Sequence, residues 1–158
     1  MIAYEDVTIG YDRDLPPVVQ SVSLRAERGA VTAIVGPNGS GKSTLVRALL
    51  GRVPLIGGRI LIDGMNVASI GRRDLARRCA VVPQREDTTF ARNVAEYIAL
   101  GRYPNQGSWS AAASGESEAV QIAARRAGVE QLLGRVTDEL SGGEWQRVRV
   151  ARALAQGG

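Results

Sequence analysis

One stretch of the chain has the residue types and the spacing of a phosphate-binding loop. Residues 36–44 read GPNGSGKST and fit the pattern G-x-x-x-x-G-K-[ST]. Glycines let the backbone curl so that successive N–H groups face inward, and a helix that begins there adds its dipole, which together make a cradle for an anion. Lys42 would bring a compact positive charge to the β- and γ-phosphates, and Ser43 a hydroxyl to Mg²⁺. The motif therefore predicts a site for the phosphates of a nucleotide.

The segments on either side have the patterns that such a loop requires. Val31–Val35 is apolar and rich in β-branched residues, which predicts a buried strand before the loop. The residues after the loop place Leu45 and Leu49 on one helical face and reach Gly51, which predicts a helix with a glycine stop. A chance glycine-rich turn would lack both flanks, so the phosphate loop is the favoured interpretation.

A second segment with binding-site chemistry, Leu140–Glu144, reads LSGGE. Ser141 is a good helix N-cap, and Glu144 three residues later completes a capping-box pattern. Gly142 and Gly143 would let another molecule approach the exposed N–H groups at the start of this helix, which continues to the last residue. On these residues alone, a second anion site and a capped helix without any ligand are equally supported.

Composition limits the classes of protein to which the chain can belong. Its 158 residues suffice for one domain with a real core. The net charge of +4 arises from 19 arginines and a single lysine, Lys42, and the 4% aromatic content leaves few platforms on which bases could stack, so no nucleic acid is expected as a partner. One cysteine, Cys79, excludes an intrachain disulfide. No apolar run approaches the roughly 20 residues of a membrane span, and no secretory signal is apparent, so a cytoplasmic protein is expected.

Three ordered motifs resemble those of the ATP-binding cassette (ABC) ATPases. The loop GPNGSGKSTL has that family's form, VVPQ ending at Gln84 is similar to its Q-loop, and LSGGE followed by WQRVRVARAL resembles its signature motif. Gln84 follows Lys42 by 42 residues and Ser141 follows it by 99, which agrees with the family's spacings. The resemblance covers essentially the whole chain and names an activity that a phosphate loop alone would leave open.

The resemblance implies ATP and Mg²⁺ as cofactors and gives each motif a role. Gln84 would offer its carbonyl oxygen to Mg²⁺, together with Ser43. The family usually has an aromatic residue before the loop that stacks on adenine; Tyr11 has the right position for it, and Tyr4 competes for the role. Trp145 is expected to pack against its helix rather than to bind a ligand. The residues implied in ATP binding are Tyr11, Gly36, Pro37, Asn38, Gly39, Ser40, Gly41, Lys42, Ser43 and Thr44.

The resemblance also implies partners. The signature would face the γ-phosphate held by the phosphate loop of a second ABC domain, in a head-to-tail dimer around two ATP molecules. GRYP, at Gly101–Pro104, resembles the ATP-binding subunits of importers for iron-siderophore, haem and cobalamin, which dock under integral membrane permease subunits on the inner face of the cell membrane. Without the resemblance, GRYP is a helix stop followed by a turn. The signature residues are Leu140, Ser141, Gly142, Gly143 and Glu144.

The implied fold class is α/β: a P-loop NTPase core of the RecA-like type with an N-terminal antiparallel β subdomain and a helical subdomain, incomplete at the C-terminus. Residues 1–158 would form one partial ABC domain. Within it, 1–86 would hold the nucleotide-binding core and the β subdomain, 87–139 the helical subdomain, and 140–158 the signature and its helix.

Local patterns predict the individual elements. Alternation favours strands in IAYEDVTIGY, VVQSVSL and GGRILIDG, and CAVV is typical of a buried core strand. A short basic helix is expected in RRDLARR, and longer helical patterns occur in VAEYIAL and ESEAVQIAARRAGVEQLL. The glycine- and serine-rich NQGSWSAAASGE, Asn105–Glu116, predicts a flexible surface loop.

The family's catalytic groups have no counterpart in the sequence. In the family, the signature helix leads into an apolar strand ending in Asp-Glu, whose Glu is the general base, and then to a switch histidine. Here Glu144 is the last acidic residue, the chain has no histidine, and RILID, ending at Asp63, precedes the signature. We therefore expect no appreciable ATP hydrolysis by these residues alone and a bare edge on the phosphate-loop strand. The alternatives are a truncated, non-hydrolytic nucleotide-binding module and a soluble, non-transport ABC ATPase.

Overall fold

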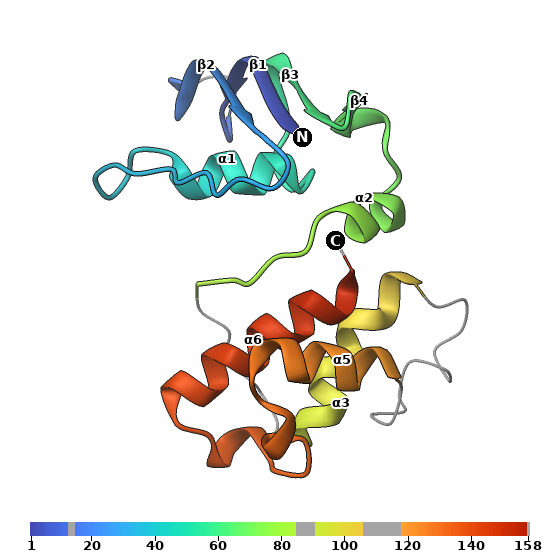
Figure 1. Ribbon diagram of the computed structural model, residues 1–158. Coiled ribbons are helices and arrows are strands. Elements are labelled where there is room, and N and C mark those ends of the chain that lie inside the picture. The colour runs from blue at the N-terminus through green and yellow to red at the C-terminus, as the bar shows by residue number, and fades with distance from the viewer. Residues whose placement is uncertain (13–14, 85–90, 106–117, 158) are drawn as a thin grey trace. The chain divides into compact units, whose positions relative to one another are not determined.

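The computed structural model shows two compact units, Met1–Leu75 and Ala76–Gly158 (Figure 1). Among the described residues, no helix is both long enough and apolar enough to cross a bilayer. The predicted subdivision at residues 86 and 139 stays a prediction. The structure describes residues 1–12, 15–84, 91–105 and 118–157.

The first unit contains a four-stranded antiparallel sheet with the strand order β2-β1-β3-β4. Successive side chains of a strand point to opposite faces, and in the central strand Val7 and Ile9 are fully buried on one face. The three longer strands lie where the alternating patterns predict them, so these predictions are confirmed. The strands are β1 (Ile2–Ile9), β2 (Val19–Ala26), β3 (Leu55–Ile62) and β4 (Met65–Asn66).

Helix α1, Lys42–Leu49, packs against this sheet (Figure 1). Its apolar face is buried through Leu45 and Leu49, and the buried Tyr4 of β1 donates a hydrogen bond of 3.0 Å to the carbonyl of Leu45. The helix stops as the glycine predicts, because the N–H of Gly51, in the left-handed region with φ 64°, bonds to the carbonyl of Ala48. The sheet thereby fixes the position of the helix that begins at the phosphate loop.

Two segments predicted as buried strands are not strands. Val31–Val35 has no strand pairing, with Val31 100% and Val35 86% exposed, and Cys79–Val82 is likewise irregular and only half-buried. A strand needs a neighbour that takes up its backbone hydrogen bonds, and the sheet of the described residues ends at β2 and β4. The apolar, β-branched composition of both segments therefore gave the wrong prediction.

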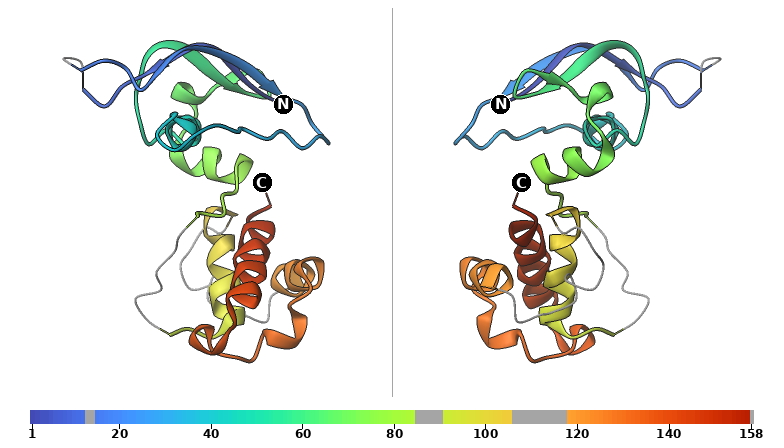
Figure 2. Two further views of the ribbon diagram at one scale, coloured as in Figure 1. Left: turned by 90° about the vertical axis from the view of Figure 1, so that its left-hand side faces the viewer. Right: turned by 90° about the vertical axis from the view of Figure 1, so that its right-hand side faces the viewer.

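The second unit is helical. Its longest helix, α6, packs against α3, α5 and the 3₁₀ segment η2 (Figure 2). The helix predicted from VAEYIAL is present. The pattern ESEAVQIAARRAGVEQLL forms α5, which ends before Gly128 in the left-handed region, and then the short η3. Residues 106–116 of the predicted surface loop lie outside the described part. The basic helix α2, Arg72–Arg78, contains the division between the units. The other elements are α3 (Val94–Ala99), η2 (Leu100–Asn105), α5 (Glu118–Ala127), η3 (Glu130–Leu132), η4 (Thr137–Glu139) and α6 (Gly142–Gln156), with η1 (Val67–Ser69) in the first unit.

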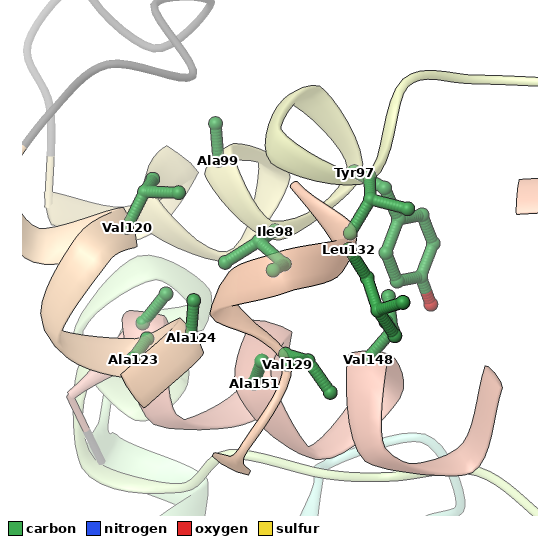
Figure 3. Close-up of a cluster of buried hydrophobic side chains, with 12 residues drawn as sticks. Tyr97, Ile98, Ala99, Val120, Ala123, Ala124, Val129, Leu132, Val148 and Ala151 are labelled. Carbon is green, nitrogen blue, oxygen red and sulfur yellow. The ribbon is translucent and has the colours of Figure 1, made fainter. Parts of the chain in front are cut away.

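An apolar core joins α3, α5 and α6 in the second unit (Figure 3). The ring of Tyr97 lies 4.7 Å from that of Trp145, centroid to centroid, which confirms the predicted packing role of Trp145. The guanidinium of Arg152 lies 4.7 Å over the ring of Tyr97. These contacts hold α6 in place from its first turn onward. The most buried members are Val94, Ile98, Val120, Ala124, Val129, Val148 and Ala151.

Candidate nucleotide site and signature helix

The backbone of the phosphate loop depends on glycine at its junction with α1. Gly41 caps the helix with φ 89°, a left-handed conformation that a side chain would strain. A Cβ at this position would also lie 2.7 Å from Cγ2 of Val19, which comes from β2. Gly39 has φ 83° for the same turn. The loop therefore has the tight path that presents its backbone N–H groups to a ligand at the start of α1.

The lysine of the motif reaches back across the loop. Its Nζ donates hydrogen bonds to the carbonyls of Gly36, at 2.8 Å, and Pro37, at 2.6 Å, and lies 3.5 Å from Oγ of Ser40. All three partners belong to the loop itself, so the ammonium of Lys42 lies against the phosphate loop. A phosphate there would meet this positive charge together with the N–H groups of the first turn of α1.

Tyr11 lies next to the phosphate loop, although 25 residues separate it from Gly36. Its hydroxyl shares a hydrogen bond of 3.2 Å with Oγ1 of the buried Thr44 and accepts one of 3.4 Å from Nη1 of Arg47. Both bonds, that of Thr44 foremost, lower the pKa of Tyr11. The residue as a whole is 58% exposed. Tyr4 of β1, the competing candidate, is buried and bonded to α1, so only Tyr11 of the two offers an open aromatic face.

The signature begins α6 as the capping-box pattern predicts. Oγ of Ser141 accepts from the N–H of Glu144 at 3.4 Å, and the N–H of Ser141 donates to Oε2 of Glu144 at 2.9 Å. Gly142 and Gly143 are exposed, and a Cβ at Gly142 would meet nothing within 4 Å. The first N–H groups of α6 are therefore accessible to a ligand.

Charged groups surround the carboxylate of Glu144. The hydrogen bonds from the Ser141 side chain and backbone, and then the charges of Arg135 and Arg147, hold the pKa of Glu144 below its usual value. Nη1 of Arg135 lies 3.5 Å from Oε1 of Glu144. Arg135 could not be predicted from the sequence, because its contact with Glu144 depends on the path of η4. Arg47 was also missed, although its spacing of three residues from Thr44 on a helix could have indicated it.

The groups predicted to hold Mg²⁺ lie in different units. Ser43 is exposed in the first turn of α1, and Gln84 is exposed at the end of its described segment in the second unit. Within the described residues, no three His, Cys, Asp or Glu side chains are grouped to hold a metal ion. The hydroxyl of Ser43 is an oxygen donor of the kind that Mg²⁺ takes alongside phosphate and water. Ser43 and Gln84 as Mg²⁺ ligands stay a prediction.

The model of one protein family, described as ABC transporter, matches residues 19–158. The match includes the phosphate loop, Gln84 and the signature helix, and it covers most of the chain. The chain belongs to the ABC transporter family. The resemblance inferred from the three motifs is thus confirmed, as is the α/β fold class of a P-loop ABC ATPase with an antiparallel sheet.

Relatives of this chain include proteins named for the import of hemin and for the transport of ferric enterobactin. The hemin import ATP-binding protein HmuV of Bordetella pertussis (strain Tohama I) is 39% identical over 140 residues, covering 89% of this chain and 52% of HmuV. The ferric enterobactin transport ATP-binding protein FepC of Escherichia coli (strain K12) is 35% identical over 152 residues, covering 96% of this chain and 55% of FepC. The chain spans about half the length of these curated relatives.

A solved structure supports the same fold. CbiO1 from Clostridium perfringens, part of the ABC transporter complex cbiONQ, superposes with a TM-score of 0.82 at 28% identity, covering 98% of this chain and 61% of CbiO1. The architecture of both units is therefore that of the corresponding part of an ABC ATPase.

Proposed function

We propose that this chain is the nucleotide-binding part of the ATP-binding subunit of an ABC importer, with an iron-siderophore, haem or cobalamin as the cargo. The observation that carries the proposal is the combination of a lysine-bearing phosphate loop with an accessible, capped signature helix in one ABC chain. Hemin import in the name of HmuV and ferric enterobactin transport in the name of FepC support the class of cargo. GRYP, at Gly101–Pro104, resembles the same importer type.

ATP would bind through residues of the first unit. The N–H groups of the loop and the first turn of α1 take the phosphates, and Nζ of Lys42 moves from the carbonyls of Gly36 and Pro37 to the β- and γ-phosphates. Tyr11 offers its exposed ring to adenine. Ser43 and Gln84 are the groups that would hold Mg²⁺, which supplies charge neutralisation on the phosphates when bound.

The signature acts on a second ABC domain. In a head-to-tail dimer, Ser141 and Gly143 bind the γ-phosphate of an ATP that lies in the phosphate loop of the partner domain, so that ATP joins the two domains. Permease subunits in the membrane would respond to this joining of the two domains. The protein would lie on the inner face of the cell membrane. ATP hydrolysis in this assembly would take its general base from outside residues 1–158 and would drive uptake of the cargo.

The importer proposal can be tested by uptake. Cells that lack the gene are given labelled ferric siderophore, haem or cobalamin, and are complemented with the wild type or with Lys42→Ala. We expect uptake of one cargo to be lost, and to be restored by the wild type alone. Normal uptake of all three in the deletion strain would contradict the importer proposal. ATP binding by the purified chain is measured separately, so that a failure of the importer proposal can be distinguished from a failure of the nucleotide site.

Tyr11→Phe is expected to weaken ATP binding at least about fivefold. The ring remains, but the bonds that hold it to Thr44 and Arg47 are lost, and a hydrogen bond of this kind contributes roughly 1 kcal/mol. Tyr11→Ala removes the ring as well and should weaken binding further. Titration with a fluorescent ATP analogue measures both variants. Equal affinity of the alanine variant and the wild type would exclude Tyr11 from the site.

A further inference from the structure

The hydroxyl of the signature serine is engaged within its own helix turn. Oγ of Ser141 lies 2.7 Å from Oε2 of Glu144 and can donate its proton to that oxygen. The same Oε2 accepts the N–H of Ser141 at 2.9 Å. One carboxylate oxygen therefore holds both donors that Ser141 could offer to an anion.

This arrangement places the negative charge of Glu144 at a helix end that, in the proposed dimer, also binds a negatively charged phosphate. Two like charges about 4 Å apart repel each other, and the repulsion is several times stronger near a protein surface than in bulk water. A phosphate that approached Ser141 and Gly143 would be repelled by an uncompensated Glu144. The capping box stabilises the helix, but by itself it opposes the binding of an anion at the same place.

Arg135 lies where it can offset this charge. Its Nη1 is 3.5 Å from Oε1 of Glu144, the carboxylate oxygen that Ser141 does not use. Its other side is fixed on Glu139, through a hydrogen bond of 2.7 Å from Nη2 to the backbone carbonyl and a contact of 3.6 Å from Nε to Oε2. The guanidinium thus bridges the turn before the signature to the first turn of α6.

We propose that Arg135 is a positioning residue for the signature: it neutralises Glu144 and holds the carboxylate by Oε1, so that Ser141 can release Oε2 and donate to a phosphate of the partner domain's nucleotide. The inference rests on the proposed ATP-joined dimer. An ion pair this exposed, with side chains 42% and 25% accessible, contributes little to folding stability. Its effect should therefore appear in nucleotide-dependent association and leave the unfolding of the chain nearly unchanged.

The test is a double-mutant cycle in the full chain with R135Q, E144Q and R135Q/E144Q. The dissociation constant of the dimer is measured by analytical ultracentrifugation with and without ATP-Mg²⁺, and thermal unfolding is followed by circular dichroism. We expect R135Q to weaken ATP-dependent association about fivefold to tenfold. E144Q keeps the capping box, because glutamine also serves at that position, and should stay within about twofold of the wild type. The double variant should return to the same range.

A charge-matched control separates the local effect from the loss of net charge. Arg126→Gln removes one positive charge from an exposed site on α5 and should leave association unchanged. Wild-type affinity in R135Q would overturn the inference, and so would a double variant as weak as R135Q. A wild-type chain that does not associate when ATP is added would instead overturn the dimer of the proposed function and, with it, this role of Arg135.

Discussion

Replacement of Lys42 by alanine is expected to weaken ATP binding by ~100-fold or more. The carbonyls of Gly36 and Pro37 hold Nζ of Lys42 against the phosphate loop, within reach of the phosphates that we propose to bind there. Hydrogen bonds to charged groups contribute roughly 1.5–3 kcal/mol each, and every 1.4 kcal/mol is about a factor of ten in affinity. Isothermal titration with ATP-Mg²⁺ measures the loss directly.

Two further variants show whether a positive charge alone is sufficient for ATP binding. Lys42→Arg keeps the positive charge but replaces a compact ammonium with a larger, planar guanidinium, which does not fit between the loop carbonyls in the same way. The affinity for ATP should therefore stay well below that of the wild type. Arg52→Ala removes a positive charge from an exposed position just after α1 and should have little effect. If Lys42→Ala bound ATP like the wild type, the phosphate loop would not be the nucleotide site.

The features that could be predicted from the sequence are those fixed within a few residues. The capping box formed by Ser141 and Glu144 closes over three residues, and both of its hydrogen bonds are present in the structure. The glycine stop at Gly51 and the alternating strands of the sheet are also local signals. Each of these patterns determines the backbone conformation of the same few residues. The phosphate loop and the start of the signature helix could therefore be inferred without knowledge of the fold.

What could not be predicted depends on distant parts of the chain. Val31–Val35 has the composition of a strand, but a strand exists only where another one pairs with it, and composition does not supply the partner. The bond between Tyr11 and Thr44 joins residues 33 positions apart. Arg135 reaches Glu144 only because η4 turns the chain back toward α6. Tertiary packing decides all three, so no local pattern indicates them.

Replacement of Gly101 by alanine is expected to destabilise the helical unit by about 3 kcal/mol. Gly101 is buried in η2, and a Cβ there would collide with the backbone carbonyl oxygen of Arg152 on α6 and lie 3.3 Å from the Cγ of that residue. Backbone cannot move aside as the end of a flexible side chain can, and overpacking typically costs about 1–3 kcal/mol. Since Arg102 donates to the carbonyl of Ala155 at 3.0 Å, a displaced η2 would also lose this contact with the last turn of α6.

Gly134→Ala is the matched control, because a Cβ at Gly134 would meet nothing within 4 Å. Both variants add the same methyl group to the helical unit, so a difference in unfolding measured by urea titration and circular dichroism reports the crowding at Gly101 alone. The GRYP segment thereby gains a structural explanation for its glycine, independent of any permease: the residue lets η2 approach the backbone of α6. If Gly101→Ala were as stable as Gly134→Ala, this close approach would not be needed for the fold, and docking to a partner would be left as the reason for a glycine there.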